Sequence, residues 1–435
     1  MPGVDALQAL VQQLEESQWA TADAVRQSQL RHVARLADFC AQHSPFFSRR
    51  LTQAGLVPAD LAAPEHFRRL PIVSRRDVQR AGPDFYCSAV PATHGAVSKT
   101  VTSGSTGEPV VARRTGVSAL FASAMVMREL IWQRRDLSGR LCLVRARAPE
   151  YVRHADWGPP ANAWTTTGPS LSLPVTADVP QLATWIREFD PTVLVIYPST
   201  LRALMAHCSA HDLSFPALRQ VLTTGETLPI DLRQSVEESL GVTLADCYSS
   251  EEFGCIAAQC PDGNGYHVMA EALLVEVLDG RGQPCEPGEI GRITVTDLHN
   301  YATPFIRYQI GDFAEVAPPC PCGRGLPTLA RIVGRERNLI AFRDGRRHWP
   351  ITGLLRVRDV VPVAQYQLVQ ESYEQIEMRL VSDRALTPEE EQRLKVIFRD
   401  TVGYPFDIRV RYFTDRIPTG PSGKFEEFVS LVETS

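Results

Sequence analysis

Two short, continuously apolar runs constrain the fold of this chain more than any other feature. They are Cys142–Val144 and Thr192–Pro198, and helical stretches surround them between Thr100 and about Gln220. An uninterrupted apolar run is typical of a strand that is covered on both faces, since neither face then meets water. The sequence therefore predicts an α/β architecture with a buried sheet.

The segments on either side have other patterns. Leucines and a valine recur at helical spacing between Leu7 and Leu14, which predicts an N-terminal helix. Residues 265–316 form short strand-like runs broken by turn residues, so we expect an antiparallel, turn-rich segment there.

The C-terminal region is predicted to be a separate, small α+β domain. Gln365–Val369 and Gln375–Val381 alternate polar and apolar residues like half-buried strands, and Thr387 begins a capping box for the helix that follows. We expect residues 335–435 to be joined by a hinge to a large domain of residues 1–334.

Composition narrows the class of partner. The chain has 435 residues, 44% of them hydrophobic and 22% charged, which fits a globular protein of at least two domains. A net charge of −5 gives no reason to expect nucleic acid or an anionic membrane as partner, since either would favour a basic face. The N-terminus has no basic segment before an apolar run, so we expect a cytoplasmic protein without a signal peptide. Its ten cysteines are then expected to be reduced thiols or metal ligands.

A loop rich in glycine and hydroxyl residues, Val101–Pro109, is the first candidate binding element. Gly104 and Gly107 permit unusual backbone angles and close approach of a phosphate, and the hydroxyls can donate hydrogen bonds to its oxygens. The alternative is a flexible polar turn. The P-loop pattern GxxxxGK[ST] does not occur here. The hydroxyl residues of the loop are Thr102, Ser103, Ser105 and Thr106.

The loop resembles the phosphate-binding signature of the adenylate-forming superfamily, which includes acyl-CoA synthetases, luciferases and nonribosomal adenylation domains. Companion motifs of that superfamily are matched in the same order. They are Thr223–Pro229, Asp246–Gly254, Ile306–Asp312, Gly334–Asn338 and Pro418–Glu426. Pro45–Val78, Thr296–Asp312 and Cys320–Arg335 resemble the phenylacetate–CoA ligase branch, and the resemblance covers nearly the whole chain.

This resemblance implies a role for each matched residue. Tyr248 and Ser249 would lie by the adenine, Glu252 would hold Mg²⁺, and Asp312 would bind the ribose hydroxyls. Arg335 would lie near the ribose and phosphate, and Lys424 would be the catalytic lysine of the adenylation step. Thr224, Gly225 and Glu226 would line the nucleotide site. Tyr197, Pro198, Ser199 and Thr223 would line the acyl pocket.

The implied activity is activation of a small acid, for which we expect an aryl acid. Attack of its carboxylate on the α-phosphate of ATP gives an acyl-AMP, and negative charge on the phosphoryl oxygens calls for positioning and positive charge. Coenzyme A would then take the acyl group after the small domain rotates. Two alternative acceptors to coenzyme A are a carrier-protein phosphopantetheine and an amine or hydroxyl group. A more remote alternative to the enzyme function is a non-catalytic nucleotide-binding scaffold. The resemblance also implies a homodimer.

Two positions depart from the superfamily pattern. Glu251 stands where relatives usually carry Ser or Thr, so Glu251 competes with Glu252 as metal ligand, and the register with Tyr248 favours Glu252. Asn338 replaces the usual Asp or Lys of the hinge, and an amide can still make the needed hydrogen bonds.

A structural zinc site is predicted within residues 255–325. Cys260, His267, Cys320 and Cys322 offer three thiolates and one imidazole, which would fill a tetrahedral Zn²⁺ shell and leave no open position. Some members of the branch carry such a zinc. Free thiols are the alternative, and Cys255 competes with Cys260.

Two further residues invite a functional reading. Cys247 lies in the adenine motif, but nothing near it in sequence suggests a base, so it is expected to pack. Arg307 is expected to be a structural or nucleotide contact.

Overall fold

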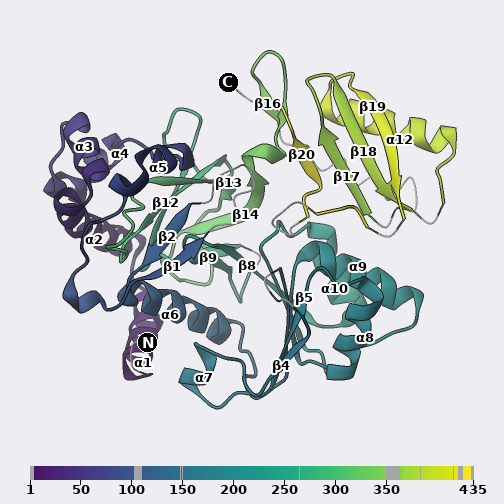
Figure 1. The fold of residues 1–435 in the computed structure, drawn as a ribbon, viewed down its shortest axis with the longest axis horizontal. Helices are drawn as coiled ribbons and strands as arrows, with labels where there is room; N and C mark the ends of the chain where they lie inside the picture. The colour runs from purple at the N-terminus through teal and green to yellow at the C-terminus, as the bar shows by residue number, and fades with distance from the viewer. Residues whose placement is uncertain are drawn as a thin grey trace. The chain divides into compact units, whose positions relative to one another are not determined.

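The computed structural model describes most of the chain, and its parts form two compact units, which are treated separately (Figure 1). The described residues are 4–101, 110–146, 148, 150–263, 265–348, 363, 365–382, 384–414, 416–419 and 425–432. The first unit comprises Met1–Pro174, Ile186–Pro198 and Phe215–Val333. The second comprises Val175–Trp185, Ser199–Ser214 and Gly334–Ser435.

Helices open the first unit, as the leucine spacing predicts. α1 buries Leu7, Leu10, Val11 and Leu14. The Ser44 side chain accepts the Phe47 N–H, and Pro45 occupies the first helical position, so α3 begins where local chemistry favours it. The helices are α1 (Val4–Ser17), α2 (Ala22–His43), α3 (Pro45–Ala54), α4 (Pro64–Arg69), α5 (Arg75–Ala81), α6 (Gly116–Trp132), α7 (Ala161–Trp164) and α10 (Ile230–Leu240).

A twelve-stranded sheet runs through this unit in the order β11-β12-β13-β14-β10-β9-β8-β7-β6-β3-β5-β4. Its parallel part contains β3 (Leu141–Arg145), β5 (Ser170–Pro174), β6 (Val193–Ile196), β7 (Gln220–Thr224) and β8 (Thr243–Ser250). The other strands are β4 (Val152–His154), β9 (Gly254–Gln259), β10 (Tyr266–Val268), β11 (Leu273–Leu278), β12 (Ile290–Asp297), β13 (Tyr308–Val316) and β14 (Thr328–Arg335). The predicted antiparallel segment is confirmed, because β10 pairs antiparallel with β9 and β14, and β12 pairs antiparallel with β11 and β13.

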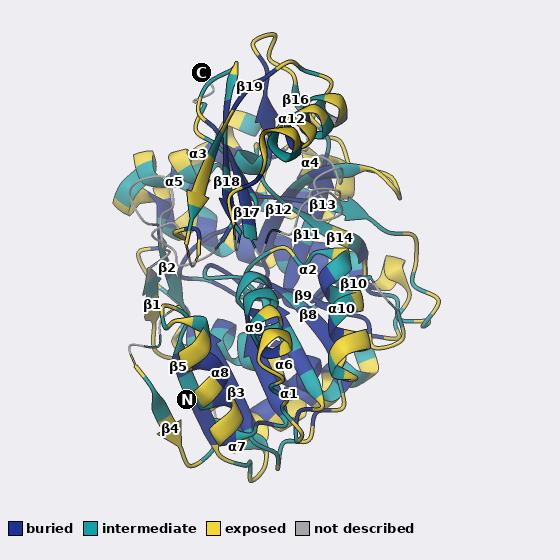
Figure 2. Ribbon diagram, turned by 90° about the vertical axis from the view of Figure 1, so that its right-hand side faces the viewer, coloured by how far each residue is buried: buried dark blue, intermediate teal, exposed yellow. Residues whose placement is uncertain are grey.

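The apolar runs form strands in the middle of this sheet. All four residues of β6 are buried, as are the first four of β3, and Figure 2 shows β3 and β9 as mostly buried. The chain passes from β3 to β5 on one side and then crosses to β6 on the other. Ligands of open α/β sheets bind outside the carboxyl ends of the strands at such a reversal. The topology therefore places the expected ligand crevice beyond Arg145 and Ile196.

A separate two-stranded ladder joins β1 (Ser98–Val101) to β2 (Val111–Arg114), with Val101 paired to Val111. The predicted phosphate loop, Thr102 to Gly107, falls between these strands and lies outside the described residues.

The C-terminal part of the second unit is the predicted α+β arrangement. Its sheet has the order β19-β18-β17-β20, and the Thr387–Glu390 capping box begins α12 as expected. Leu394 and Phe398 of α12 pack into one core with residues of the sheet, and Figure 1 shows the helix beside β17, β18 and β19. The elements are β15 (Ile340–Ala341), β16 (Arg347–His348), β17 (Gln365–Gln370), β18 (Gln375–Val381), α12 (Pro388–Val402), β19 (Asp407–Phe413) and β20 (Phe428–Ser430). The second unit also holds most of α8 (Val179–Phe189) and α9 (Pro198–Ala210). Among the described residues, no helix has the length and apolar character to cross a membrane.

Candidate active site

The two motifs that follow β7 and form β8 meet at the carboxyl edge of the sheet. Thr224 Oγ1 donates to the Cys247 carbonyl at 3.1 Å and lies 3.0 Å from Ser249 Oγ. Gly225 has φ +80°, a left-handed conformation that glycine adopts without strain, and it turns the chain away from the strand. The predicted nucleotide residues Thr224, Gly225 and Ser249 are therefore neighbours.

Tyr248 and Asp312, from motifs far apart in sequence, are joined directly. The Tyr248 hydroxyl donates to Asp312 Oδ2 at 2.7 Å, and the two residues are 8% and 7% exposed. This contact brings the residue predicted to lie by adenine against the residue predicted to bind the ribose hydroxyls. Adenine and ribose are adjacent in a nucleotide, so the pairing fits the predicted site.

The acidic pair lies in the turn between β8 and β9. Glu252 is 7% exposed, whereas Glu251 is half-buried and its carbonyl accepts a hydrogen bond from Arg114 Nη2 at 3.1 Å. Arg114 ends β2, the strand that follows the predicted phosphate loop. The turn is therefore tied to the strand that leaves the loop. The choice of Glu252 over Glu251 as metal ligand stays a prediction.

Tyr197 lies just beyond β6, at the predicted acyl pocket. The Ala146 N–H, just beyond β3, donates to the Tyr197 hydroxyl at 3.4 Å. Burial raises the pKa of Tyr197, and the negative charges of Glu226 and Glu251 raise it further. Pro198 and Ser199 are the first two residues of α9, and Thr223 is fully buried.

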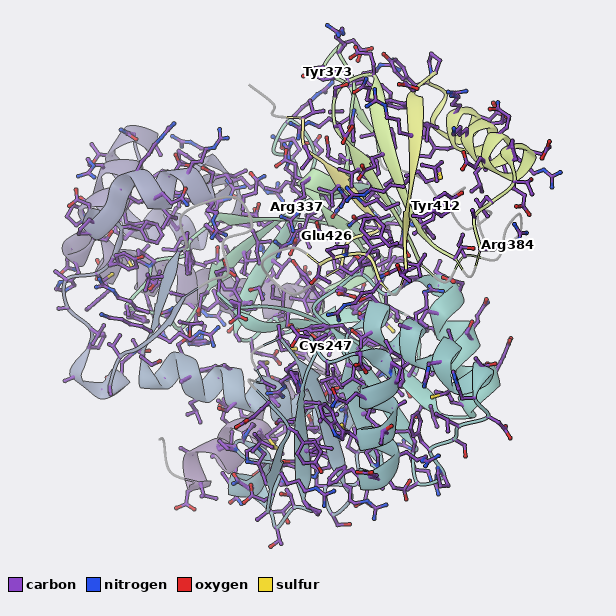
Figure 3. The ribbon with its side chains drawn as sticks, turned by 45° about the vertical axis from the view of Figure 1, so that its right-hand side comes forward. Cys247, Arg337, Tyr373, Arg384, Tyr412 and Glu426 are labelled. Atoms are coloured by element: carbon purple, nitrogen blue, oxygen red, sulfur yellow. The ribbon has the colours of Figure 1, made fainter. Side chains whose placement is uncertain are left out.

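Asn338, the predicted hinge residue, makes two hydrogen bonds within the second unit. Its Oδ1 accepts the Arg335 N–H at 2.7 Å, and its Nδ2 donates to the Phe428 carbonyl at 2.6 Å. Beside it, Arg337 pairs with Glu426 at 2.6 Å, and Figure 3 labels both. The hinge motif is thus bonded to the chain that follows the predicted catalytic lysine. Lys424 itself lies outside the described residues.

The four predicted zinc ligands form one cluster. Their ligand atoms all lie within 4.8 Å of one another, with Cys260 and Cys320 sulfurs 3.7 Å apart and Cys322 Sγ 3.3 Å from His267 Nε2. A tetrahedron with Zn–S bonds of about 2.3 Å has edges of about 3.8 Å. The donor set and its spacing therefore fit a Zn²⁺ ion. Cys255 lies elsewhere, with its sulfur 3.3 Å from that of Cys247.

The charge states in the cluster also suit a metal. Burial and the charge of Arg324 lower the pKa of His267 to about 4, so its imidazole is neutral at pH 7, as a ligand must be. Burial opposes ionisation of Cys322, but hydrogen bonds from Arg324 more than offset this and lower the thiol pKa. Burial raises the pKa of Cys260 to about 12. A bound cation would have to assist the ionisation of this thiol at neutral pH.

The cluster is packed against the N-terminal helices. Arg324 Nε donates to Gln18 Oε1 at 2.8 Å, and its guanidinium lies over the rings of Trp19 and Trp132. A metal here would tie the turn-rich segment to α1 and α6, which is a structural role.

Two residues that could have had chemical roles are structural. Arg307 is 2% exposed, has φ +54°, pairs with Glu276 at 3.0 Å and donates to the carbonyls of Arg68 and Leu70. Cys247 packs against the main core, as predicted.

Sequence reasoning missed Asp246 as a site residue. It is 4% exposed and accepts hydrogen bonds from Thr223 and Tyr266. The sequence shows that Asp246 stands two residues before Tyr248. It does not show the partners of Asp246, because these depend on which strands are adjacent and in what register.

The chain is similar to several known proteins. Residues 91–300 match the family model described as AMP-binding enzyme. The phenylacetate–coenzyme A ligase of Thermus thermophilus is 26% identical over 80% of this chain and 78% of its own length, and that of Pseudomonas putida is 26% identical over 78% and 76%. A crystal structure of 2-hydroxyisobutyryl-CoA ligase with 2-HIB-AMP matches with a TM-score of 0.73 and 19% identity over 92% of this chain and 88% of that one. The predicted α/β fold of the adenylate-forming ligases is thereby confirmed.

Proposed function

Because this chain carries an AMP-binding enzyme domain and is homologous over most of its length to phenylacetate–coenzyme A ligases, we propose that it is an AMP-forming acid–thiol ligase. It would join a small carboxylic acid to coenzyme A at the expense of ATP. The observation that carries this proposal is the 2.7 Å hydrogen bond between Tyr248 and Asp312, which unites two nucleotide motifs at the carboxyl edge of the sheet.

In the first half-reaction, a carboxylate oxygen of the acid attacks the α-phosphorus of ATP, and pyrophosphate leaves. Tyr248 and Asp312 would hold adenine and ribose, while Thr224 and Ser249 lie at the strand ends beside them. Lys424 would neutralise charge on the phosphoryl oxygens, together with the Thr102–Gly107 loop. Mg²⁺, held by Glu252, would supply further positive charge at the phosphates.

In the second half-reaction, the thiol sulfur of coenzyme A attacks the acyl carbonyl carbon, the acyl–phosphate bond breaks, and AMP leaves. We propose that residues 335–435 act as the mobile domain and move about Asn338 between the steps. The hydrogen bonds of Asn338 to Arg335 and Phe428 support this, because they join the hinge motif to the segment after Lys424.

The remaining assignments belong to the same proposal. The Cys260, His267, Cys320 and Cys322 cluster would hold a structural Zn²⁺, and its donor spacing supports this. An aryl acid is favoured by Tyr197 at the expected pocket and by the phenylacetate relatives. The acceptor alternatives are a carrier-protein phosphopantetheine and an amine or hydroxyl, and the assembly would be a homodimer.

Acid-dependent ATP–pyrophosphate exchange, followed by acceptor competition, tests the function. We expect exchange with phenylacetate, benzoate or anthranilate above that with short aliphatic acids, and AMP release that coenzyme A accelerates more than pantetheine-loaded carrier protein or free amines. Exchange with no acid in a broad panel would contradict the ligase assignment. Exchange with acceleration only by an amine would correct the acceptor.

A further inference from the structure

The residues that precede two predicted zinc ligands are hydrogen-bonded to Asp246 in β8. Gln259 precedes Cys260, Tyr266 precedes His267, and the two preceding residues face each other in the β9–β10 ladder. Their side chains both reach Asp246. The Tyr266 hydroxyl donates to Asp246 Oδ2 at 2.7 Å, and the Asp246 N–H donates to Gln259 Oε1 at 3.0 Å.

The second carboxylate oxygen of Asp246 has a different partner. Thr223 Oγ1 donates to Asp246 Oδ1 at 2.5 Å, and Thr223 is fully buried at the end of β7. Thr224, the next residue, bonds the Cys247 carbonyl and lies by Ser249. Cys247, labelled in Figure 3, separates Asp246 from Tyr248 in β8. Asp246 thus accepts one hydrogen bond from the residue before His267 and one from the residue before Thr224.

Because the hydrogen-bonded residues around Asp246 are buried, one of them cannot move without disturbing the others. Asp246, Gln259 and Tyr266 are each at most 6% exposed, and a buried carboxylate that loses a hydrogen-bond donor is left unsatisfied. A shift of Tyr266 therefore disturbs Asp246, and a shift of Asp246 disturbs Thr223. Arg233 reinforces the same network by donating to Gln259 Oε1 at 2.8 Å and to the Leu244 carbonyl at 2.8 Å.

We propose that Asp246 is a positioning residue through which zinc binding and nucleotide binding strengthen each other. A metal on Cys260 and His267 holds the strands that carry Gln259 and Tyr266, and so holds Asp246 for Thr223 and Tyr248. By thermodynamic reciprocity, a nucleotide that orders Tyr248 and Thr224 must strengthen metal retention by the same factor. This inference rests on the proposed nucleotide site and on the proposed zinc.

The test measures metal retention by the folded, zinc-loaded chain. Zinc is titrated out with the chromogenic chelator 4-(2-pyridylazo)resorcinol, with and without saturating AMP. We expect AMP to raise the chelator concentration needed for half removal about tenfold, a typical coupling. In Tyr266→Phe, one zinc per chain should remain, but AMP should change retention by less than about twofold.

A matched variant controls for loss of a phenol hydroxyl. Tyr301 is half-buried in the same unit, and its hydroxyl makes no hydrogen bond within the described part of the chain. Tyr301→Phe should keep the full effect of AMP. Thr223→Val cuts the network at its other end and should also lose the effect, which covers a failure of Tyr266→Phe to fold.

Measuring AMP binding to the wild-type chain by calorimetry distinguishes a failure of this inference from a failure of the proposed function. If AMP does not bind the wild-type chain, the nucleotide site is wrong and the inference with it. If AMP binds but zinc retention is the same with and without it, or if Tyr266→Phe responds like wild type, the coupling is overturned and the function stands. A purified chain that takes up no zinc overturns the inference as well.

Discussion

Substitution of Asp246 by Asn should change how the stability of the protein depends on pH. Burial raises the pKa of the Asp246 carboxyl to about 6 from its usual 3.8, despite opposing hydrogen bonds from Thr223 and Tyr266. Between these values the folded chain keeps a proton that the unfolded chain has released. The contribution of this group to stability is therefore fully present below about pH 4 and is lost as pH rises through 6.

The size of the effect follows from the shift in pKa. A difference of about two units between folded and unfolded states corresponds to about 3 kcal/mol. The amide in the Asp246→Asn variant cannot titrate, so the free energy of unfolding of wild type minus that of the variant should fall by about 3 kcal/mol between pH 4 and pH 7. For a unit of about 300 residues this is a relative change in Tm of about 5 °C.

Differential scanning calorimetry at half-unit pH intervals measures this difference. The matched control is Asp400→Asn, which makes the same substitution at an exposed aspartate of α12 that lacks the burial of Asp246. A constant difference for Asp246→Asn, or one that grows with pH, would refute the claim that burial dominates the electrostatics of this carboxyl.

Three further substitutions have defined outcomes. Tyr248→Phe removes the hydrogen bond to Asp312 and should raise the KM for ATP about tenfold in pyrophosphate exchange, while an unchanged KM would remove Tyr248 from the nucleotide site. Asn338→Ala removes the hydrogen bonds to Arg335 and Phe428. Measured by rapid quench, it should slow acyl transfer to coenzyme A at least about tenfold more than it slows acyl-AMP formation. Equal slowing of the two steps would argue against a hinge role. Arg307→Met leaves Glu276 buried without its partner and should cost about 3–5 kcal/mol in urea unfolding, whereas a cost under about 1 kcal/mol would contradict the structural role.

Local features of the fold could be predicted because their causes are local. The continuous apolar run at Thr192–Pro198 contains the fully buried β6, and Thr387 caps α12 through contacts three residues away. The predicted zinc ligands were found for another reason. Residue type and the close spacing within each pair suggested Cys260, His267, Cys320 and Cys322, and the fold brings the two pairs together although up to 62 positions separate them.

Partners set by strand register could not be predicted. Hydrophobic alternation shows that a residue lies in a strand but does not say which strand is its neighbour. The contact of Asp246 with Tyr266 depends on β8, β9 and β10 being adjacent in the sheet, and that of Tyr248 with Asp312 depends on β13 approaching β8. The carbonyl partners of Arg307 could not be predicted either, since Arg68 and Leu70 are more than 200 positions away in the sequence.

A crystal structure of this chain with AMP bound would test the proposed nucleotide site most directly. We expect the adenine beside Tyr248, the ribose hydroxyls on Asp312, and the phosphate toward the Thr102–Gly107 loop. A nucleotide found away from the carboxyl edge of β7 and β8, with Tyr248 still bonded to Asp312 and neither residue touching it, would contradict the assignment.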